Sequence, residues 1–295
     1  MNGPTSGGGQ PGLTLLKLGG ELLEPGPGLA PLVNAIQQLA ASGPLIIVHG
    51  AGREIDAETQ RRGVPKQAVD GLRITDAATL DAVIAVLAGT VNTRLVAALV
   101  GAGTRAVGLT GVDAAIGLSE KAPAHRAVDG RLVDLGLVGQ PVAGTSGAAA
   151  DTAFQQRAVQ KPALLADLIR HGYVPVIACL GVDAAGQVLN VNADTLAAAL
   201  AASSGAQRLI IAGATAGVLD SHHATLATLD DAGIDRMIAD GSASLGMVAK
   251  LRACRDALHG GVTDVAIVSG RHAGGFLTAP GTRIVAPAAT GVPTT

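Results

Sequence analysis

Two lysines stand in places where a nearby anion would explain them. Lys17 lies within an apolar strand pattern at residues 13–20. An ammonium group is costly to bury unless it meets an anion, and snorkelling out of the strand end is the alternative. Lys250 follows a Gly- and Ser-rich segment at the start of a predicted helix, and a solvated helix face is the alternative there. Both lysines are candidates for binding a negatively charged substrate.

The stretch NVNAD at residues 190–194 places three amide or acid side chains before a run of alanine and leucine. A helix needs only one such side chain to cap its first N–H groups. A helix N-terminus also carries partial positive charge, which favours bound anions. Asn190, Asn192 and Asp194 therefore indicate either a ligand site or a cap followed by a polar turn.

Arg73 precedes the predicted start of a long helix at residues 76–101. Its guanidinium group could clamp a carboxylate with two parallel hydrogen bonds, and a surface ion pair is the alternative. The adjacent His222 and His223 do not share a helix face, and no third ligand lies near them in the sequence. We therefore expect a polar turn at these histidines and no protein-bound metal site.

The elements that must position these side chains alternate along the chain between β-branched runs and Ala/Leu-rich helical patterns. Apolar strands separated by helices are typical of a parallel sheet covered on both faces. We predict an α/β fold, an open αβα sandwich with a mainly parallel central sheet. Ligands in such sheets bind beyond the carboxyl ends of the strands. The predicted strands cover 13–20, 44–52, 105–111, 174–181, 208–217 and 264–270, the predicted helices 31–43, 53–62, 76–101, 161–171, 244–260 and one after Asp194, with hairpins over 112–145 and an exposed loop at 142–160.

Composition disfavours several classes of protein. A net charge of −2 with one Tyr, two Phe and no Trp argues against nucleic-acid binding. The absence of an uninterrupted apolar stretch of about 18 residues argues against a membrane span. No P-loop motif occurs in the sequence, and no GxGxxG motif opens the first predicted βα unit, which argues against a Rossmann dinucleotide site. The two cysteines, Cys179 and Cys254, are isolated, and we expect them to be buried and reduced in the cytoplasm.

Short motifs along the chain resemble those of the amino-acid kinase family and, within it, of the N-acetylglutamate kinases. The resemblance spans about residues 13–288, and the combination of NVNAD with GLRITD is specific within the superfamily. The matching motifs, in chain order, are KLGG (17–20), HGAG (49–52), GLRITD (71–76), NVNAD (190–194), GVLD (217–220), GMVAKL (246–251) and GTRIV (281–285).

The resemblance implies a kinase that transfers the γ-phosphoryl group of ATP to the side-chain carboxylate of N-acetyl-L-glutamate, an early step of arginine biosynthesis. ATP would enter with Mg²⁺, and no tightly bound cofactor is implied. Phosphoryl transfer depends mainly on positioning and charge neutralisation. By resemblance, the catalytic residues are Lys17 and Lys250, on opposite sides of the transferring group, and Asp194, which holds both ammonium groups.

The resemblance also implies binding residues for both substrates. Arg73 and Asn190 would bind the α-carboxylate end of the amino acid, and the backbone N–H groups of Ala51 and Gly52 would meet the reacting carboxylate. The implied nucleotide-binding residues are Thr215, Gly217, Val218, Leu219, Ser242, Ala243, Ser244 and Gly246.

The implied organisation is two lobes between two tails. Residues 13–200 would form the substrate-binding and dimerisation lobe, and residues 201–288 the nucleotide-binding lobe. Residues 1–12 would be a flexible tail and residues 289–295 a frayed one. We expect a cytoplasmic homodimer with no nucleic-acid or membrane partner.

Two positions depart from the family's motifs. Ala51 replaces the middle glycine of the usual HGGG, so its methyl group needs room and a negative φ. Ala214 stands where the family carries an aspartate near the phosphates and the magnesium waters, and we expect the Thr215 hydroxyl or an ordered water to compensate. These departures keep two alternatives open: a kinase for another acylated acidic amino acid, and a catalytically weak regulatory or ligand-binding homologue.

Overall fold

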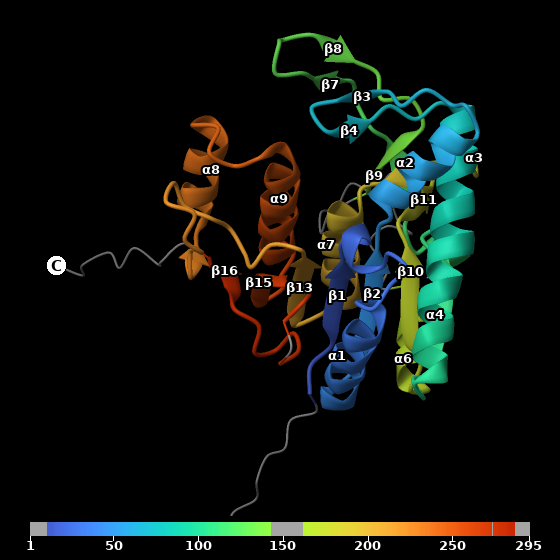
Figure 1. Ribbon diagram of the computed structural model, residues 1–295, viewed down its shortest axis with the longest axis vertical. Helices are drawn as coiled ribbons and strands as arrows, with labels where there is room; N and C mark the ends of the chain where they lie inside the picture. Colours follow the sequence, from blue (N-terminus) through green and yellow to red (C-terminus); the bar gives the residue numbers. More distant parts are fainter. Residues whose placement is uncertain (1–10, 143–161, 273, 287–295) are drawn as a thin grey trace, which may run out of the picture.

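A computed structural model describes residues 11–142, 162–272 and 274–286. Within these ranges the predicted αβα sandwich is confirmed: one large sheet lies between two layers of helices (Figure 1). The predictions for the N-terminal tail up to residue 10, for loop residues 143–160 and for the tail at 289–295 lie outside the described residues.

The central sheet has eight strands in the order β14-β16-β15-β13-β1-β2-β10-β5. All neighbouring pairs are parallel except β15–β16. Every residue of β1, β2 and β10 is buried, as their continuous apolar sequences predict. The strands are β1 (Thr14–Leu18), β2 (Leu45–His49), β5 (Ala106–Thr110), β10 (Val174–Ala178), β13 (Arg208–Gly213), β14 (Thr228–Leu229), β15 (Asp264–Ser269) and β16 (Gly281–Ile284).

Helices cover both faces of this sheet (Figure 1). On one face α1 and α4 contact each other, and on the other α7 packs along α9. Helix α8 was not predicted. The helices are α1 (Leu29–Ser42), α2 (Gly52–Arg61), α3 (Ala77–Ile84), a π-helical segment (Ala85–Val91), α4 (Asn92–Gly101), α6 (Ala163–Arg170), α7 (Ala193–Ser204), α8 (Asp231–Ala239) and α9 (Leu245–His259).

A smaller four-stranded sheet, in the order β11-β12-β9-β6, lies beyond one end of the central sheet (Figure 1). The predicted hairpins of the middle segment are present, but β12 was not predicted, and it pairs parallel with β9. This sheet leads the chain from β10 into α7 through the NVNAD motif. Its strands are β6 (Ser119–Lys121), β9 (Val138–Pro141), β11 (Leu180–Val182) and β12 (Val188–Val191), and two separate hairpins are β3 (Ala68–Val69) with β4 (Leu72–Arg73) and β7 (His125–Arg126) with β8 (Leu132–Val133).

The strand order reverses direction between β1 and β13. From β1 the chain continues to β2 on one side, whereas from β13 it continues to β15 on the other side. Such a switch point opens a crevice at the carboxyl ends of the two strands, where α/β proteins bind their ligands. In this chain the crevice lies beyond Leu18 and Gly213.

One helical run passes a test of length and composition for a membrane span, although Asp81, Asn92 and Arg94 interrupt its apolar sequence. By length and composition alone, the 25 residues Ala77–Gly101 would suffice. Val83, Leu87 and Leu95 on this run are fully or almost fully buried in the hydrophobic core. Because the core helix of a folded domain passes the same test, the run is weak support for a membrane span.

Candidate active site

Lys17, Asp194 and Lys250 meet at the carboxyl edge of the central sheet. The Lys17 Nζ lies 2.7 Å from Asp194 Oδ1, and the Lys250 Nζ lies 3.8 Å from Asp194 Oδ2. The Lys17 and Asp194 side chains are only 6% and 7% exposed, whereas that of Lys250 is 22% exposed. Two ammonium groups that share one carboxylate leave one uncompensated positive charge, so the cluster favours an anion.

Local structure brings the three side chains together. Lys17 is the fourth residue of the buried strand β1, and Asp194 lies in the first turn of α7. Asn192 caps α7, because its Oδ1 accepts hydrogen bonds from the N–H groups of Asp194 at 2.8 Å and Thr195 at 3.2 Å. With the cap supplied by Asn192, the Asp194 carboxylate is available to the lysines.

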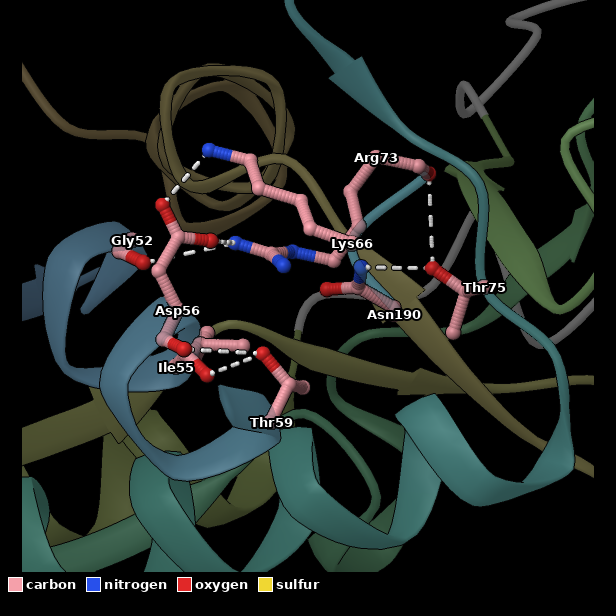
Figure 2. A network of polar contacts seen from close by, with 8 residues as sticks. All are labelled: Gly52, Ile55, Asp56, Thr59, Lys66, Arg73, Thr75 and Asn190. Carbon is pink, nitrogen blue, oxygen red and sulfur yellow. Dashed lines mark hydrogen bonds and ion pairs between the residues drawn. The ribbon is translucent and has the colours of Figure 1, made fainter. Parts of the chain in front are cut away.

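Asn190 has a third role, different from those of Asn192 and Asp194. It lies in β12, and its Nδ2 donates to the Thr75 hydroxyl at 3.1 Å, as Figure 2 shows. The Thr75 hydroxyl lies in turn 3.4 Å from the Arg73 carbonyl oxygen. The structure therefore brings Asn190 close to the segment that carries Arg73, although the two are far apart in the sequence.

The Arg73 guanidinium group is paired with Asp56 of α2 (Figure 2). Its Nη2 also donates to the Gly52 carbonyl oxygen at 3.3 Å, and both contacts use this one nitrogen. Lys66 lies 2.7 Å from the other oxygen of Asp56. Although burial raises the pKa of Asp56, hydrogen bonds from Lys66 and Arg73 outweigh it and hold that pKa below its usual value. Sequence reasoning missed Asp56, since it is one of several charged residues on a polar helix.

The two Gly-rich turns after β1 and β2 pack against each other. A Cβ atom on Gly20 would lie 2.7 Å from the Cα of Ala51, so glycine is required at position 20. Ala51 is buried with a φ of −155°, so the negative φ that its methyl group needs is present. Gly52 begins α2 and is exposed. The first N–H groups of a helix have no partner within the helix, so those of Ala51 and Gly52 are suited to an anion.

His49, at the end of β2, is fully buried beside this turn. The Asn92 Nδ2 lies 3.1 Å from its Nε2 and 2.9 Å from the Val176 carbonyl oxygen. Burial lowers the pKa of His49 to about 4. The ring is therefore neutral near pH 7, and it is part of the buried core beside the turn.

The predicted nucleotide-binding residues lie in two segments, after β13 and before α9. Thr215 and Leu219 are exposed, whereas the Val218 side chain is in the core and its N–H donates to Thr282. In the second segment Ala243 is buried and Ser244 is the N-cap position of α9. The Val218 carbonyl accepts from the Leu226 N–H, and the Ala243 N–H donates to the Met237 carbonyl, so these backbone groups are already paired within the protein. The remaining predicted members, Gly217, Ser242 and Gly246, lie in these same segments.

A carboxylate that sequence reasoning missed reaches the turn after β13. Glu21 Oε1 accepts a hydrogen bond of 3.0 Å from the N–H of Ala214. The only sequence signal for it is an acidic residue directly after the KLGG motif.

The two cysteines are buried, as predicted. Burial raises the pKa of Cys179 to about 12 and that of Cys254 further. Neither thiol is therefore a nucleophile near neutral pH.

Comparison with known proteins finds relatives over most of the chain. The family model described as "Amino acid kinase family" matches residues 12–269. An acetylglutamate kinase from Solibacter usitatus is 38% identical over 257 residues, covering 87% of this chain and 90% of that protein. One from Sphingopyxis alaskensis is 39% identical over 230 residues, covering 77% of this chain and 71% of that protein.

Solved structures show the same fold at lower identity. An N-acetylglutamate synthase from Neisseria gonorrhoeae, complexed with coenzyme A and N-acetyl-glutamate, aligns with a TM-score of 0.72 at 24% identity. The alignment covers 95% of this chain and 60% of that one. The carbamate kinase from Giardia lamblia bound to AMP-PNP aligns with a TM-score of 0.61 at 14% identity, covering 93% of this chain and 98% of that one.

Proposed function

The chain belongs to the amino acid kinase family and, within it, to the acetylglutamate kinases, and we propose that it phosphorylates the side-chain carboxylate of N-acetyl-L-glutamate. In this reaction a carboxylate oxygen forms a bond to the γ-phosphorus of ATP, the bond to the β–γ bridging oxygen breaks, and ADP leaves. The product is an acyl phosphate, and phosphorylation of N-acetyl-L-glutamate is an early step of arginine biosynthesis.

The observation that carries the proposal is the Lys17–Asp194–Lys250 cluster. A phosphoryl group in flight carries negative charge on its equatorial oxygens, and fixed cations stabilise it. Asp194 holds the Lys17 ammonium at 2.7 Å and lies 3.8 Å from that of Lys250. Because Lys17 is buried and locked while Lys250 is partly exposed, we assign Lys17 as a fixed cation and Lys250 as one that adjusts to the nucleotide.

We assign the amino-acid substrate to the space between α2 and β12. The N–H groups of Ala51 and Gly52 would meet the reacting carboxylate at the start of α2. Arg73 and Asn190 would bind the α-carboxylate at the other end of the substrate. Both known contacts of Arg73 use Nη2, so its remaining donors can bind this carboxylate while Asp56 keeps the group in place.

We assign the nucleotide to the crevice between β1 and β13 and to residues 201–288. The segments 214–219 and 242–246 lie at the carboxyl end of β13 and at the start of α9. Magnesium would enter with ATP and neutralise the charge of its phosphates.

The proposal also includes a homodimeric state and a cytoplasmic location. The buried and unreactive cysteines are compatible with a reducing compartment. Size-exclusion chromatography with light scattering would measure the oligomeric state. A monomer at the concentration used for the activity assay would contradict the dimer.

The activity is tested by trapping the acyl phosphate with hydroxylamine. Purified protein, ATP and Mg²⁺ are incubated with N-acetyl-L-glutamate, with N-acetyl-L-aspartate or with free L-glutamate. We expect hydroxamate chiefly from N-acetyl-L-glutamate. A clear preference for another acylated acid would identify a related kinase, and no hydroxamate from any acceptor would favour a regulatory homologue.

A further inference from the structure

The Glu21 carboxylate occupies the crevice between the carboxyl ends of β1 and β13. Its Oε1 accepts the hydrogen bond of Ala214 N–H at 3.0 Å, across 193 positions of the sequence. A Cβ atom on Gly19 would lie 2.5 Å from both carboxylate oxygens, and one on Gly213 would lie 3.3 Å from Oε1. Gly19, directly after β1, and Gly213, the last residue of β13, therefore leave room for this carboxylate.

The charge of Glu21 is not neutralised by a cation from the described part of the chain. Among the residues that the structure describes, no Lys or Arg forms an ion pair with it, whereas Lys17 and Lys250 both face Asp194. Its Oε2 forms no hydrogen bond within the same part of the chain. The carboxylate thus keeps an acceptor oxygen in a crevice where a nucleotide's phosphates are expected.

A carboxylate beside phosphate groups is repulsive unless a cation lies between them. Magnesium prefers oxygen ligands and keeps several of its waters, which carboxylates bind well. Position 214, directly after β13, offers only a methyl group, so the side chain that reaches this place comes from Glu21. We propose that Glu21 is the metal-facing carboxylate of this protein and binds the water shell of the Mg²⁺ that arrives with ATP. The inference rests on the proposed kinase function.

This assignment replaces the expectation that the Thr215 hydroxyl compensates for Ala214. Thr215 is exposed in the turn, and a hydroxyl brings no charge. Glu21 brings a full negative charge. Its carboxylate is held in place by the N–H of Ala214, the residue that has no carboxylate of its own.

The test compares binding of AMP-PNP, which is not hydrolysed, to the wild-type chain and to Glu21→Gln. Isothermal titration calorimetry is performed with excess Mg²⁺ and again with EDTA. Glutamine keeps an oxygen that can accept the Ala214 N–H, so the turn is preserved while the charge is lost. We expect about tenfold weaker binding with Mg²⁺ and no weakening with EDTA, because only the metal contact is lost.

Glu24→Gln is the matched control. Glu24 lies three positions further on and pairs with the exposed Arg53, so its loss should leave both affinities unchanged. Equal weakening of Glu21→Gln with and without Mg²⁺ would assign Glu21 a purely structural role and overturn the inference. Tighter binding under both conditions would show that Glu21 merely competes with phosphate, and unchanged binding would exclude any role. Each of these results would overturn it.

Failure of the inference and failure of the proposed function are distinguishable. AMP-PNP binding does not depend on which acceptor is phosphorylated, whereas the hydroxylamine assay does. A wild-type chain that binds Mg-AMP-PNP through Glu21 but yields no hydroxamate would retain the inference and contradict the function. Hydroxamate formation together with a magnesium-independent Glu21→Gln effect would do the reverse.

Discussion

Lys17 and Asp194 form a buried ion pair, 2.7 Å between Nζ and Oδ1, which joins the first strand to the helix that begins within NVNAD. A buried pair of this kind gains little net stability, because desolvation of both charges offsets their attraction. Removing one partner is costly, however, since the other charge stays buried. The pair therefore couples the stability of the fold to the site.

Lys17→Met is expected to lower both turnover and stability. Loss of a fixed cation from an anionic transition state should reduce turnover at least about a hundredfold. Asp194, left with only the longer contact to Lys250, should cost about 3 kcal/mol in the free energy of unfolding, measured with urea. The double variant Lys17→Met with Asp194→Leu should regain much of that stability and stay inactive. If the double variant lost as much as the two single variants together, the pair would not be coupled.

Lys250→Ala is expected to lower turnover with little change in stability. Its side chain is 22% exposed and lies 3.8 Å from Asp194, so its removal should change the free energy of unfolding by less than about 1 kcal/mol. Turnover should still fall about a hundredfold or more. Lys121→Ala, which removes an exposed lysine paired with Asp134, is the control and should retain full turnover. Near-normal turnover of Lys250→Ala would remove it from the proposed mechanism.

Arg73→Ala is expected to raise the KM for N-acetyl-L-glutamate roughly ten- to hundredfold, as loss of a charged hydrogen bond implies. The KM for ATP should change much less, because Arg73 lies by α2 and β12 rather than at the nucleotide crevice. Arg73→Lys should recover only part of the loss, since an ammonium cannot make the bidentate contact. Equal effects on both substrates would contradict the carboxylate assignment.

The parts of the site that the residue types alone predicted are those where a residue is unusual for its local structure. Lys17 stands in an apolar strand, and NVNAD holds more polarity than a cap needs, so the residue types and their spacing were enough to make both of them candidates for a binding site. The three side chains of that motif proved to have different partners: Thr75, the α7 backbone and the two lysines.

Residues that are ordinary for their local structure were missed. Glu21 follows a glycine turn, where an acidic residue is ordinary, and its partner Ala214 is distant in the sequence. Asp56 sits on a charged helix, where any carboxylate looks solvated. Strand β12 is too short to give a clear period, and its pairing depends on β9 and β11. Such contacts depend on tertiary structure, and the local sequence pattern does not predict them.

His49 is expected to make stability depend on pH between about 4 and 6.5. Its pKa is lowered from 6.5 to about 4 in the fold, so in this interval the unfolded chain binds more protons there than the folded one. Stability from His49 is therefore complete above about pH 6.5 and is lost as the pH falls towards 4, by about 3 kcal/mol in all.

His49→Asn removes the titrating group and isolates this contribution. Urea unfolding at several pH values should show wild-type and variant converging as the pH falls, because only the wild type loses the His49 contribution. Parallel curves would mean that His49 is not held neutral by burial.

Ala214→Asp tests position 214 together with Glu21. Ala214 is exposed, so an aspartate there has room and stays hydrated. In the Glu21→Gln background the new carboxylate should tighten Mg-AMP-PNP binding about tenfold, by restoring a charge that faces the metal's water shell. In the wild-type background the gain should be smaller, because two adjacent carboxylates repel each other and share one magnesium ion. Calorimetry of the wild type, the two single variants and the double variant measures how strongly the two positions are coupled in Mg-AMP-PNP binding. Equal gains in both backgrounds would show that the two positions act independently and that Glu21 does not stand in for the missing aspartate.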